Sequence, residues 1–205
     1  MPDAPSFIPR PARWVVRLLV GKVNVVGSVP PGPVLLCANH HSYRDVFLFG
    51  VIRASSRLLV DPLVLTFPFL KNLTRRWGFV RVSIDEAVAL LRDGQTVAIC
   101  PTGLVEAHGQ SVLPFKTGAV RIAQQAGVPL VPVYFSYGSY PGLWIMRIPI
   151  TYQNILLFCL WPFYRRGGRI VIGQPMDATG DIKERTKDLK AAAHSKDEPS
   201  AGFPR

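Results

Sequence analysis

The sequence Ala-Asn-His-His-Ser-Tyr-Arg-Asp, residues 38–45, joins two apolar segments. Residues 34–37 before it form a short apolar run that predicts a buried strand, and residues 46–49 after it predict the core face of a helix. Two histidines and a carboxylate therefore lie where a strand ends, and ligands of open α/β sheets bind at the carboxyl ends of strands. Because imidazole titrates near neutral pH and a carboxylate fixes its tautomer, the cluster is typical of a general base.

Outside this stretch, predicted strands and helices alternate along the chain. We expect strands at residues 23–26, 34–38, 57–60, 79–82, 96–100, 128–135 and 169–172. Helices are expected at residues 45–52, 67–76 and 116–126. Ser83 and Glu86 have the spacing of a capping box and predict the start of a further helix, which Asp93-Gly94 ends. Strands separated by helices predict a single α/β domain whose largely parallel, mixed sheet is covered by helices on both faces.

The length of 205 residues fits one domain with flanking segments. Residues 1–21 predict an N-terminal amphipathic helix, with Trp14 and Leu18 on one side and arginines around it. This helix can lie in a membrane interface or pack on the domain's own core, and its periodicity fits both. Residues 22–179 form the predicted folded domain. Residues 180–205 predict a charged, partly disordered tail that starts as a helix.

The composition is both basic and apolar. Lys and Arg number 24 against 13 Asp and Glu, a net charge of +11, and 48% of the residues are hydrophobic. Nucleic-acid-binding proteins are usually basic and hydrophilic, so this combination favours an anionic membrane surface over nucleic acid. A merely basic cytosolic enzyme is the plain alternative. The aromatic and basic segment 136–164 fits an interface-lying segment as well as core packing.

The location expected from the sequence is the cytoplasmic side of a membrane, with peripheral attachment. The cysteines, Cys37, Cys100 and Cys159, are isolated and odd in number, which indicates reduced core residues and no disulfide framework. The N-terminal apolar patch is short and interrupted by Arg17, unlike a signal peptide. No run reaches the roughly 18 to 20 apolar residues that span a bilayer.

Two histidines compete for the role of base. On a regular helix, five residues correspond to about 140° of rotation, so His41 and Asp45 would share a face and His40 and Asp45 would not. His40 can pair with Asp45 only from the loop before the helix. A metal site from His40, His41, Asp45 and His108 is disfavoured because nothing fixes its geometry, and we expect no metal. Asn39 is interpreted as a turn former.

The spacing of Asn39, His40 and Asp45 resembles the N-H-x4-D motif of the glycerolipid acyltransferases, the family of the 1-acylglycerol-3-phosphate acyltransferases. Further blocks follow in the family's order: Trp-Gly-Phe-Val-Arg-Val at residues 77–82, Pro-Thr-Gly at 101–103, and Pro-Phe-Lys-Thr-Gly-Ala at 114–119 with Gly-Val-Pro-Leu-Val-Pro-Val at 127–133. The resemblance covers residues 24–175. It implies the fold of these acyltransferases.

The resemblance implies acyl transfer in a ternary complex. His40 would take the proton of an acceptor hydroxyl, which attacks the thioester carbonyl of acyl-CoA or acyl carrier protein, and Asp45 would orient the imidazole. The acceptor would be a lysophospholipid or a related membrane lipid. No cofactor and no covalent intermediate is implied. The expected partners are the thioester co-substrate and a membrane surface with anionic lipids, and no nucleic acid.

The implied substrate-binding residues are Arg81, Thr102, Gly103 and Lys116. The family's third block runs Pro-Glu-Gly-Thr-Arg and here runs Pro-Thr-Gly-Leu-Val, without the glutamate and the arginine. The arginine of the second block would fall near Ile84, and Arg81 stands three positions earlier. Because only arginine offers a planar two-pronged set of donors to phosphate, the acceptor need not be lysophosphatidic acid. Arg81 and Lys116 are candidates for another anion site, or are solvated surface cations.

A second hypothesis comes from a different class of protein. The altered third block fits a catalytically altered member of the family that binds lipid or a partner protein. The intact pair of His40 and Asp45 favours the enzyme.

Overall fold

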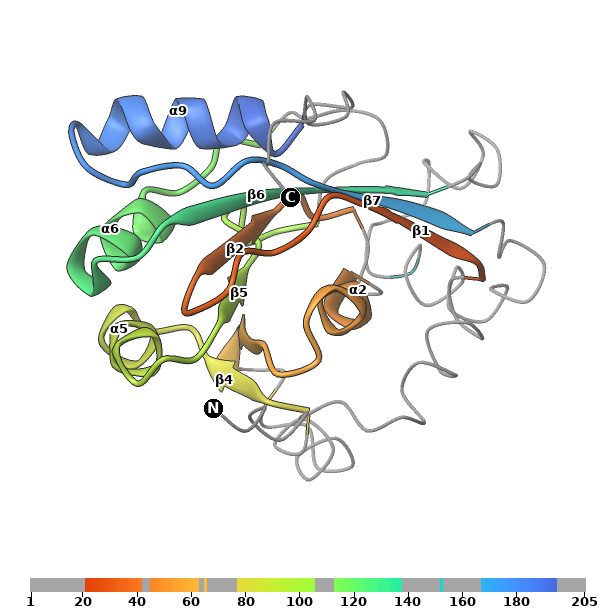
Figure 1. The fold of residues 1–205 in the computed structure, drawn as a ribbon, viewed down its shortest axis with the longest axis horizontal. Coiled ribbons are helices and arrows are strands. Elements are labelled where there is room, and N and C mark those ends of the chain that lie inside the picture. Colours follow the sequence, from red (N-terminus) through yellow and green to blue (C-terminus); the bar gives the residue numbers. More distant parts are fainter. Residues whose placement is uncertain are drawn as a thin grey trace.

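The computed structural model describes residues 21–41, 45–62, 65, 77–105, 113–137, 152 and 167–194 (Figure 1). Several predicted features lie outside these ranges. They are the amphipathic segment up to residue 20, the helix at 67–76, nearly all of the aromatic segment 136–164, His108 and Cys159.

The described residues form one seven-stranded sheet with the order β1-β7-β6-β2-β5-β3-β4. Its strands are β1 (Val23–Val26), β2 (Leu35–Ala38), β3 (Arg57–Val60), β4 (Phe79–Arg81), β5 (Val97–Ile99), β6 (Leu130–Tyr137) and β7 (Gly168–Ile172). All neighbouring strands run parallel except β6 and β7. The predicted largely parallel, mixed sheet is therefore confirmed, and β2, which carries the histidine stretch, is its central strand.

Helices cover both faces of this sheet (Figure 1). Helices α5 (Ile84–Arg92), α6 (Gly118–Ala126) and α9 (Ile182–Ala192) pack on one face, and α2 (Asp45–Ile52) packs on the other. The side chains of β2 alternate between the two cores: Leu35 and Cys37 face α5 and α6, whereas Leu36 and Ala38 face α2. Burial on both faces explains why β2 is apolar at every position.

Most element boundaries agree with the sequence expectation to within two residues. The predicted N-terminal cap of α5 is present, because the Ser83 hydroxyl accepts a hydrogen bond from the Glu86 amide at 3.5 Å. Helix α6 ends at Gly127, whose φ of 69° is the left-handed conformation that glycine adopts most readily. Helix α6 begins two residues later than expected, since the Lys116 amide donates to the Pro101 carbonyl instead.

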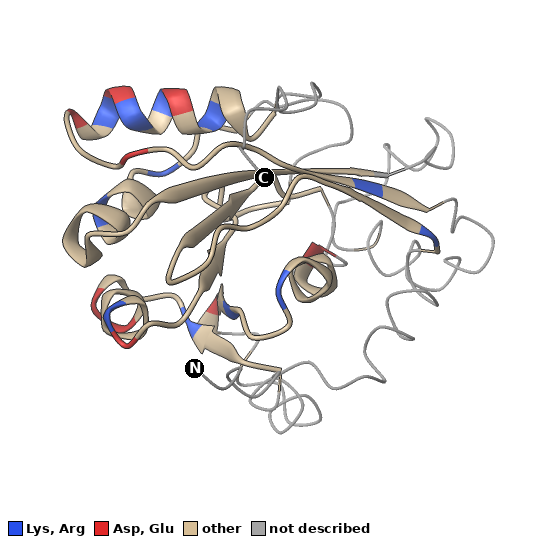
Figure 2. Cartoon of the chain, viewed as in Figure 1, with Lys and Arg blue, Asp and Glu red and all other residues tan. Residues whose placement is uncertain are grey.

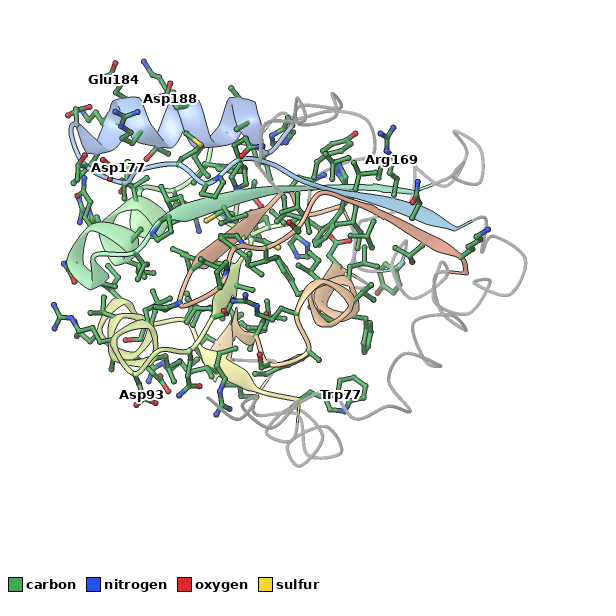
Figure 3. All side chains as sticks on the ribbon, viewed as in Figure 1. Trp77, Asp93, Arg169, Asp177, Glu184 and Asp188 are labelled. Carbon is green, nitrogen blue, oxygen red and sulfur yellow. The ribbon has the colours of Figure 1, made fainter. Side chains whose placement is uncertain are left out.

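The charged residues lie mainly on the helices at the periphery (Figure 2). Helix α9 carries both signs, with Glu184 and Asp188 projecting from its outer side (Figure 3). Its inner side buries Thr186 and Leu189. The basic excess is therefore not concentrated on α9. Within the part of the chain that the structure describes, no helix combines the length and apolar character needed to cross a membrane.

Candidate active site

Asn39 fixes the chain immediately after the central strand. Its side-chain amide donates to the Phe135 carbonyl at 2.9 Å and accepts from the Phe135 amide at 2.7 Å. The fully buried Asn39 side chain thus acts like a peptide group and prolongs the pairing of β2 with β6 beyond Ala38 and Val133. The sequence suggested a turn former; instead, Asn39 binds a strand that lies 96 residues away.

Two sets of contacts hold helix α2, one from within the helix and one from the residue that follows it. The Phe49 ring meets the Phe135 ring edge to face, with centroids 5.0 Å apart. Just after the helix, the Arg53 guanidinium donates to the carbonyls of Pro30 and Gly32 at 2.7 and 2.8 Å. These contacts fix α2 against the sheet, so that Asp45, its first residue, has a defined position.

His40 and Asp45 form a hydrogen-bonded pair at the carboxyl end of β2. The Nδ1 atom of His40 lies 2.8 Å from Oδ2 of Asp45, and the His41 amide donates to the same oxygen at 2.7 Å. The Asp45 side chain is completely buried, whereas 15% of the His40 side chain is exposed. His40 precedes the helix and its ring reaches Asp45, as required by the five-residue spacing.

This geometry assigns different groups to the two histidines. His40 contributes its ring to the contact with Asp45, and His41 contributes its backbone amide. With the proton of His40 on Nδ1 and directed at the carboxylate, Nε2 is the nitrogen with a lone pair. The start of α2 also favours the negative charge of Asp45, because the helix dipole is positive there.

Cys100 is a third member of the cluster that sequence reasoning assigned to the core. It follows β5, the neighbour of β2, and its Sγ lies 3.8 Å from the Asn39 carbonyl oxygen. Cys100 is also near enough to His40 to influence the pKa of its imidazole. Cys100 is only partly buried. A usable signal existed, since Cys100 is the last residue of an apolar run and therefore stands at the carboxyl edge of the sheet.

The neighbours of His40 determine its protonation. Burial lowers the pKa of His40, while negative charge at Cys100 and the hydrogen bond and charge of Asp45 raise it. The raising contributions prevail, and the pKa of His40 lies above its ordinary value. The imidazolium form is thus stabilised by the groups around it.

Three of the predicted substrate-binding residues lie together: Thr102 and Gly103 in the loop after β5, and Lys116 shortly before α6. The buried Thr102 hydroxyl donates to the Leu104 carbonyl at 2.8 Å and so holds the loop. Gly103 has a φ of 68°, and a Cβ atom there would lie 2.7 Å from the Lys116 Nζ. The Lys116 ammonium therefore lies against the bare backbone of Gly103, in the loop that follows β5.

Arg81 is placed apart from this group. It ends β4, the outermost strand, and its side chain is exposed. Three strand spacings separate β4 from β2, which corresponds to about 14 Å. Thr102 and Gly103, with Lys116 against Gly103, therefore follow the strand next to β2, whereas Arg81 ends a strand three positions away from β2. No group of three or more potential metal ligands occurs among the described residues.

Replacing Asn39 by Ala should lower the free energy of unfolding by about 2–4 kcal/mol, because the buried N–H and C=O of Phe135 lose their partners. Urea denaturation followed by circular dichroism measures the change. Asn24→Ala, at an exposed position of β1, is the control and should change the unfolding free energy little. Equal stability of the two variants would contradict the proposed importance of the Asn39 amide.

Replacing Asp45 by Asn should lower the pKa of His40, since the carboxylate raises it and burial of the ring remains. NMR titration of the imidazole signals of wild type and variant measures the difference. Asp93→Asn, at the exposed end of α5, is the control and should leave the His40 titration unchanged. An unchanged pKa in Asp45→Asn would show that the contact does not stabilise the imidazolium.

Three comparisons relate the chain to known proteins. The family model described as Acyltransferase matches residues 22–136. A 1-acyl-sn-glycerol-3-phosphate acyltransferase of Saccharomyces cerevisiae is 30% identical over 169 residues, 69% of this chain and 56% of the relative. A lyso-ornithine lipid O-acyltransferase of Pseudomonas aeruginosa is 29% identical over 136 residues, 60% of this chain and 52% of the relative. The chain thus spans about half the length of these relatives.

The fold has a counterpart among solved structures. The crystal structure of the 1-acyl-sn-glycerophosphate (LPA) acyltransferase PlsC from Thermotoga maritima superposes with a TM-score of 0.66 and 23% identity, over 89% of this chain and 73% of that one. This match confirms the fold expected from the sequence motifs. The family model covers β1 to β5 and all but the last residue of β6, and with them His40, Asp45, Cys100 and Lys116. The chain therefore belongs to the acyltransferase family.

Proposed function

We propose that this protein is an O-acyltransferase of phospholipid biosynthesis. It moves a fatty acyl group from the thioester of acyl-CoA or acyl carrier protein to a hydroxyl of a lysophospholipid or a related membrane lipid. The observation that carries the proposal is the 2.8 Å contact between His40 and the fully buried Asp45, at the carboxyl end of the central strand. Both residues lie within the part of the chain that matches the family model.

In this proposal His40 is the general base. Its Nε2 takes the proton of the acceptor hydroxyl, the oxygen attacks the thioester carbonyl, and the proton leaves with the released thiol. Asp45 holds the ring and stabilises the imidazolium that forms between these steps. A positioned base of this kind accelerates a reaction roughly 10²- to 10⁴-fold.

The relatives leave the choice of acceptor open. One is named for 1-acyl-sn-glycerol-3-phosphate and another for a lyso-ornithine lipid, at almost the same identity to this chain. The third block of this chain lacks the glutamate and arginine of the usual pattern. We therefore assign the anionic part of a substrate, on the acceptor or the donor, to Lys116 beside Gly103.

His40→Ala should lower kcat/KM by roughly 10²- to 10⁴-fold, because the base is lost. His41→Ala should have a much smaller effect, since His41 reaches Asp45 through its backbone amide, which the substitution keeps. The measurement is the release of thiol and the formation of acylated lipid, with acyl-CoA and a panel of lysolipids.

The pH profile gives a second test of the same base. Because the pKa of His40 is raised, its neutral, proton-accepting form is populated only at higher pH than in an ordinary histidine. The acid limb of kcat/KM should thus lie above a pH of about 6.5.

Loss of activity in His41→Ala and not in His40→Ala would refute the assignment of His40 as the base. If no acceptor is acylated and no thioester is consumed by the wild type, the catalytically altered, lipid- or protein-binding alternative replaces the enzyme.

Lys116→Ala should raise the KM of the anionic substrate, because its ammonium lies one strand away from His40. Arg81→Ala is the matched control, since it also removes an exposed cation but from the outermost strand. Steady-state kinetics with acceptor and donor varied separately identifies which substrate Lys116 contacts. A larger increase of KM in Arg81→Ala than in Lys116→Ala would reverse the assignment.

We further propose that the protein works peripherally on the cytoplasmic face of a membrane rich in anionic lipids. The net charge of +11 supports this proposal, as do Val82 and Leu104, which are 48% and 64% exposed after the carboxyl ends of β4 and β5. Flotation with liposomes containing anionic lipid should carry the protein upward at low salt, and high salt should weaken the effect. Protein that stays at the bottom of the gradient at low salt would rule out this attachment.

A further inference from the structure

One arginine joins the far end of α2 to the edge of the sheet opposite His40. Arg53 directly follows α2, and its backbone amide donates to the Phe49 carbonyl at 3.0 Å, which continues the hydrogen-bonding pattern of the helix. Its guanidinium donates through Nη1 to the Gly32 carbonyl at 2.8 Å and through Nη2 to the Pro30 carbonyl at 2.7 Å. Arg53 therefore ties the end of α2 to the segment that leads into β2.

The same guanidinium also reaches the strand beside β2. Nη1 donates to the hydroxyl of Thr96 at 2.5 Å, and Thr96 is buried and immediately precedes β5. The Thr96 carbonyl in turn accepts from the amide of Arg57, the first residue of β3, at 2.8 Å. A guanidinium carries several N–H donors in one plane, so it can bond separate segments at once. Arg53 thus contacts residues at the amino ends of β2 and β5 together.

These contacts link β2 and α2 at both of their ends. The carboxyl end of β2 is joined to the start of α2 by the contact of His40 with Asp45, and the end of α2 is joined to the segment before β2 by Arg53. Between these ends, β2 and α2 pack against each other in one core (Figure 1). Every residue of α2 other than Asp45 and Gly50 is apolar, and hydrophobic attraction has no direction. The directional hydrogen bonds at its ends therefore fix the rotation of α2 and its position along its axis.

We propose that Arg53 is a positioning residue for the acyl transfer, which acts through α2 to hold Asp45, and with it the His40 ring, in the arrangement that the reaction needs. This inference rests on the proposed function, since it concerns the same base. Arg53 acts at a distance, because the eight residues of α2 separate it from Asp45 by about 12 Å. A displacement of a positioned group by about 1 Å can cost on the order of 10²-fold in rate. A change at Arg53 should therefore lower the rate of the chemical step more than it weakens substrate binding.

Arg92 provides a matched comparison within the same domain. It is the last residue of α5, and its Nη2 donates to the Gln125 carbonyl of α6 at 2.7 Å. Arg92 thus also ties the end of a helix to the backbone of another element, but on the face of the sheet opposite α2. A change at Arg92 removes a similar contact and leaves both links between β2 and α2 in place.

The test compares the kinetics of Arg53→Lys and Arg92→Lys with acyl-CoA and lysolipid. A lysine keeps the positive charge but offers one nitrogen in place of the two through which Arg53 donates. The measurements are made at a pH above the acid limb, where a changed pKa of His40 does not itself alter the rate. We expect Arg53→Lys to lower kcat roughly 10- to 100-fold with KM nearly unchanged. Arg92→Lys should retain the wild-type kcat.

NMR titration of the His40 imidazole supplies a second readout. Arg53→Lys should lower the pKa of His40, because a loosened contact with Asp45 raises the pKa less while burial of the ring still lowers it. Arg92→Lys should leave the titration unchanged. A wild-type kcat or a wild-type titration of His40 in Arg53→Lys would overturn the inference, and so would an equal change in Arg92→Lys.

Thr96→Val keeps the inference testable if Arg53→Lys does not fold. It removes only the hydroxyl that accepts from Arg53, so both readouts should change in the same direction by a smaller amount. A folded Thr96→Val that matches the wild type in both would then overturn the inference. The NMR titration requires no turnover. A wild type that consumes no thioester would therefore refute the proposed function alone, and the titration of His40 in the variants would still decide whether Arg53 positions the pair.

Discussion

The site depends on the pair of hydrogen bonds between the Asn39 amide and the backbone of Phe135. After β2 the chain must leave the sheet for α2, and a strand end that leaves a sheet exposes backbone groups of its neighbour. The Asn39 side chain pairs with both the N–H and the C=O of Phe135. The chain can therefore leave the sheet at His40 without leaving these buried backbone groups unpaired. The Phe135 ring then meets Phe49, which ties the same point of β6 to α2 and hence to Asp45.

A completely buried carboxylate is tolerated here because the His40 ring and the His41 amide both donate hydrogen bonds to it. Burying a charge costs several kcal/mol unless it is paired. Asp45 receives the His40 ring and the His41 amide on one oxygen and stands at the start of a helix. The same arrangement stabilises the imidazolium. The electrostatics that permit the fold are thus also those that a proton-accepting histidine requires.

The sequence predicted those features that depend on local pattern. Periodicity and spacing predict the strands, the helices, the helix cap at Ser83 and the placement of His40 before α2. Features that depend on distant partners were missed or misread: Asn39 contacts a residue 96 positions away, and Cys100 meets a carbonyl 61 positions away. Predicting that Arg81 lies three strands away from β2 requires the strand order, which no local sequence pattern reveals.

The pairing of β1 with β7 constrains the order in which the protein can fold. Val23 of β1 aligns with Gly168 of β7, and β1 has no other strand partner among the described residues. During synthesis, β1 therefore leaves the ribosome long before its partner exists, whereas β2 to β6 can pair among themselves. The strands that carry the site can assemble first, and the edge of the sheet closes only when the last strand is made.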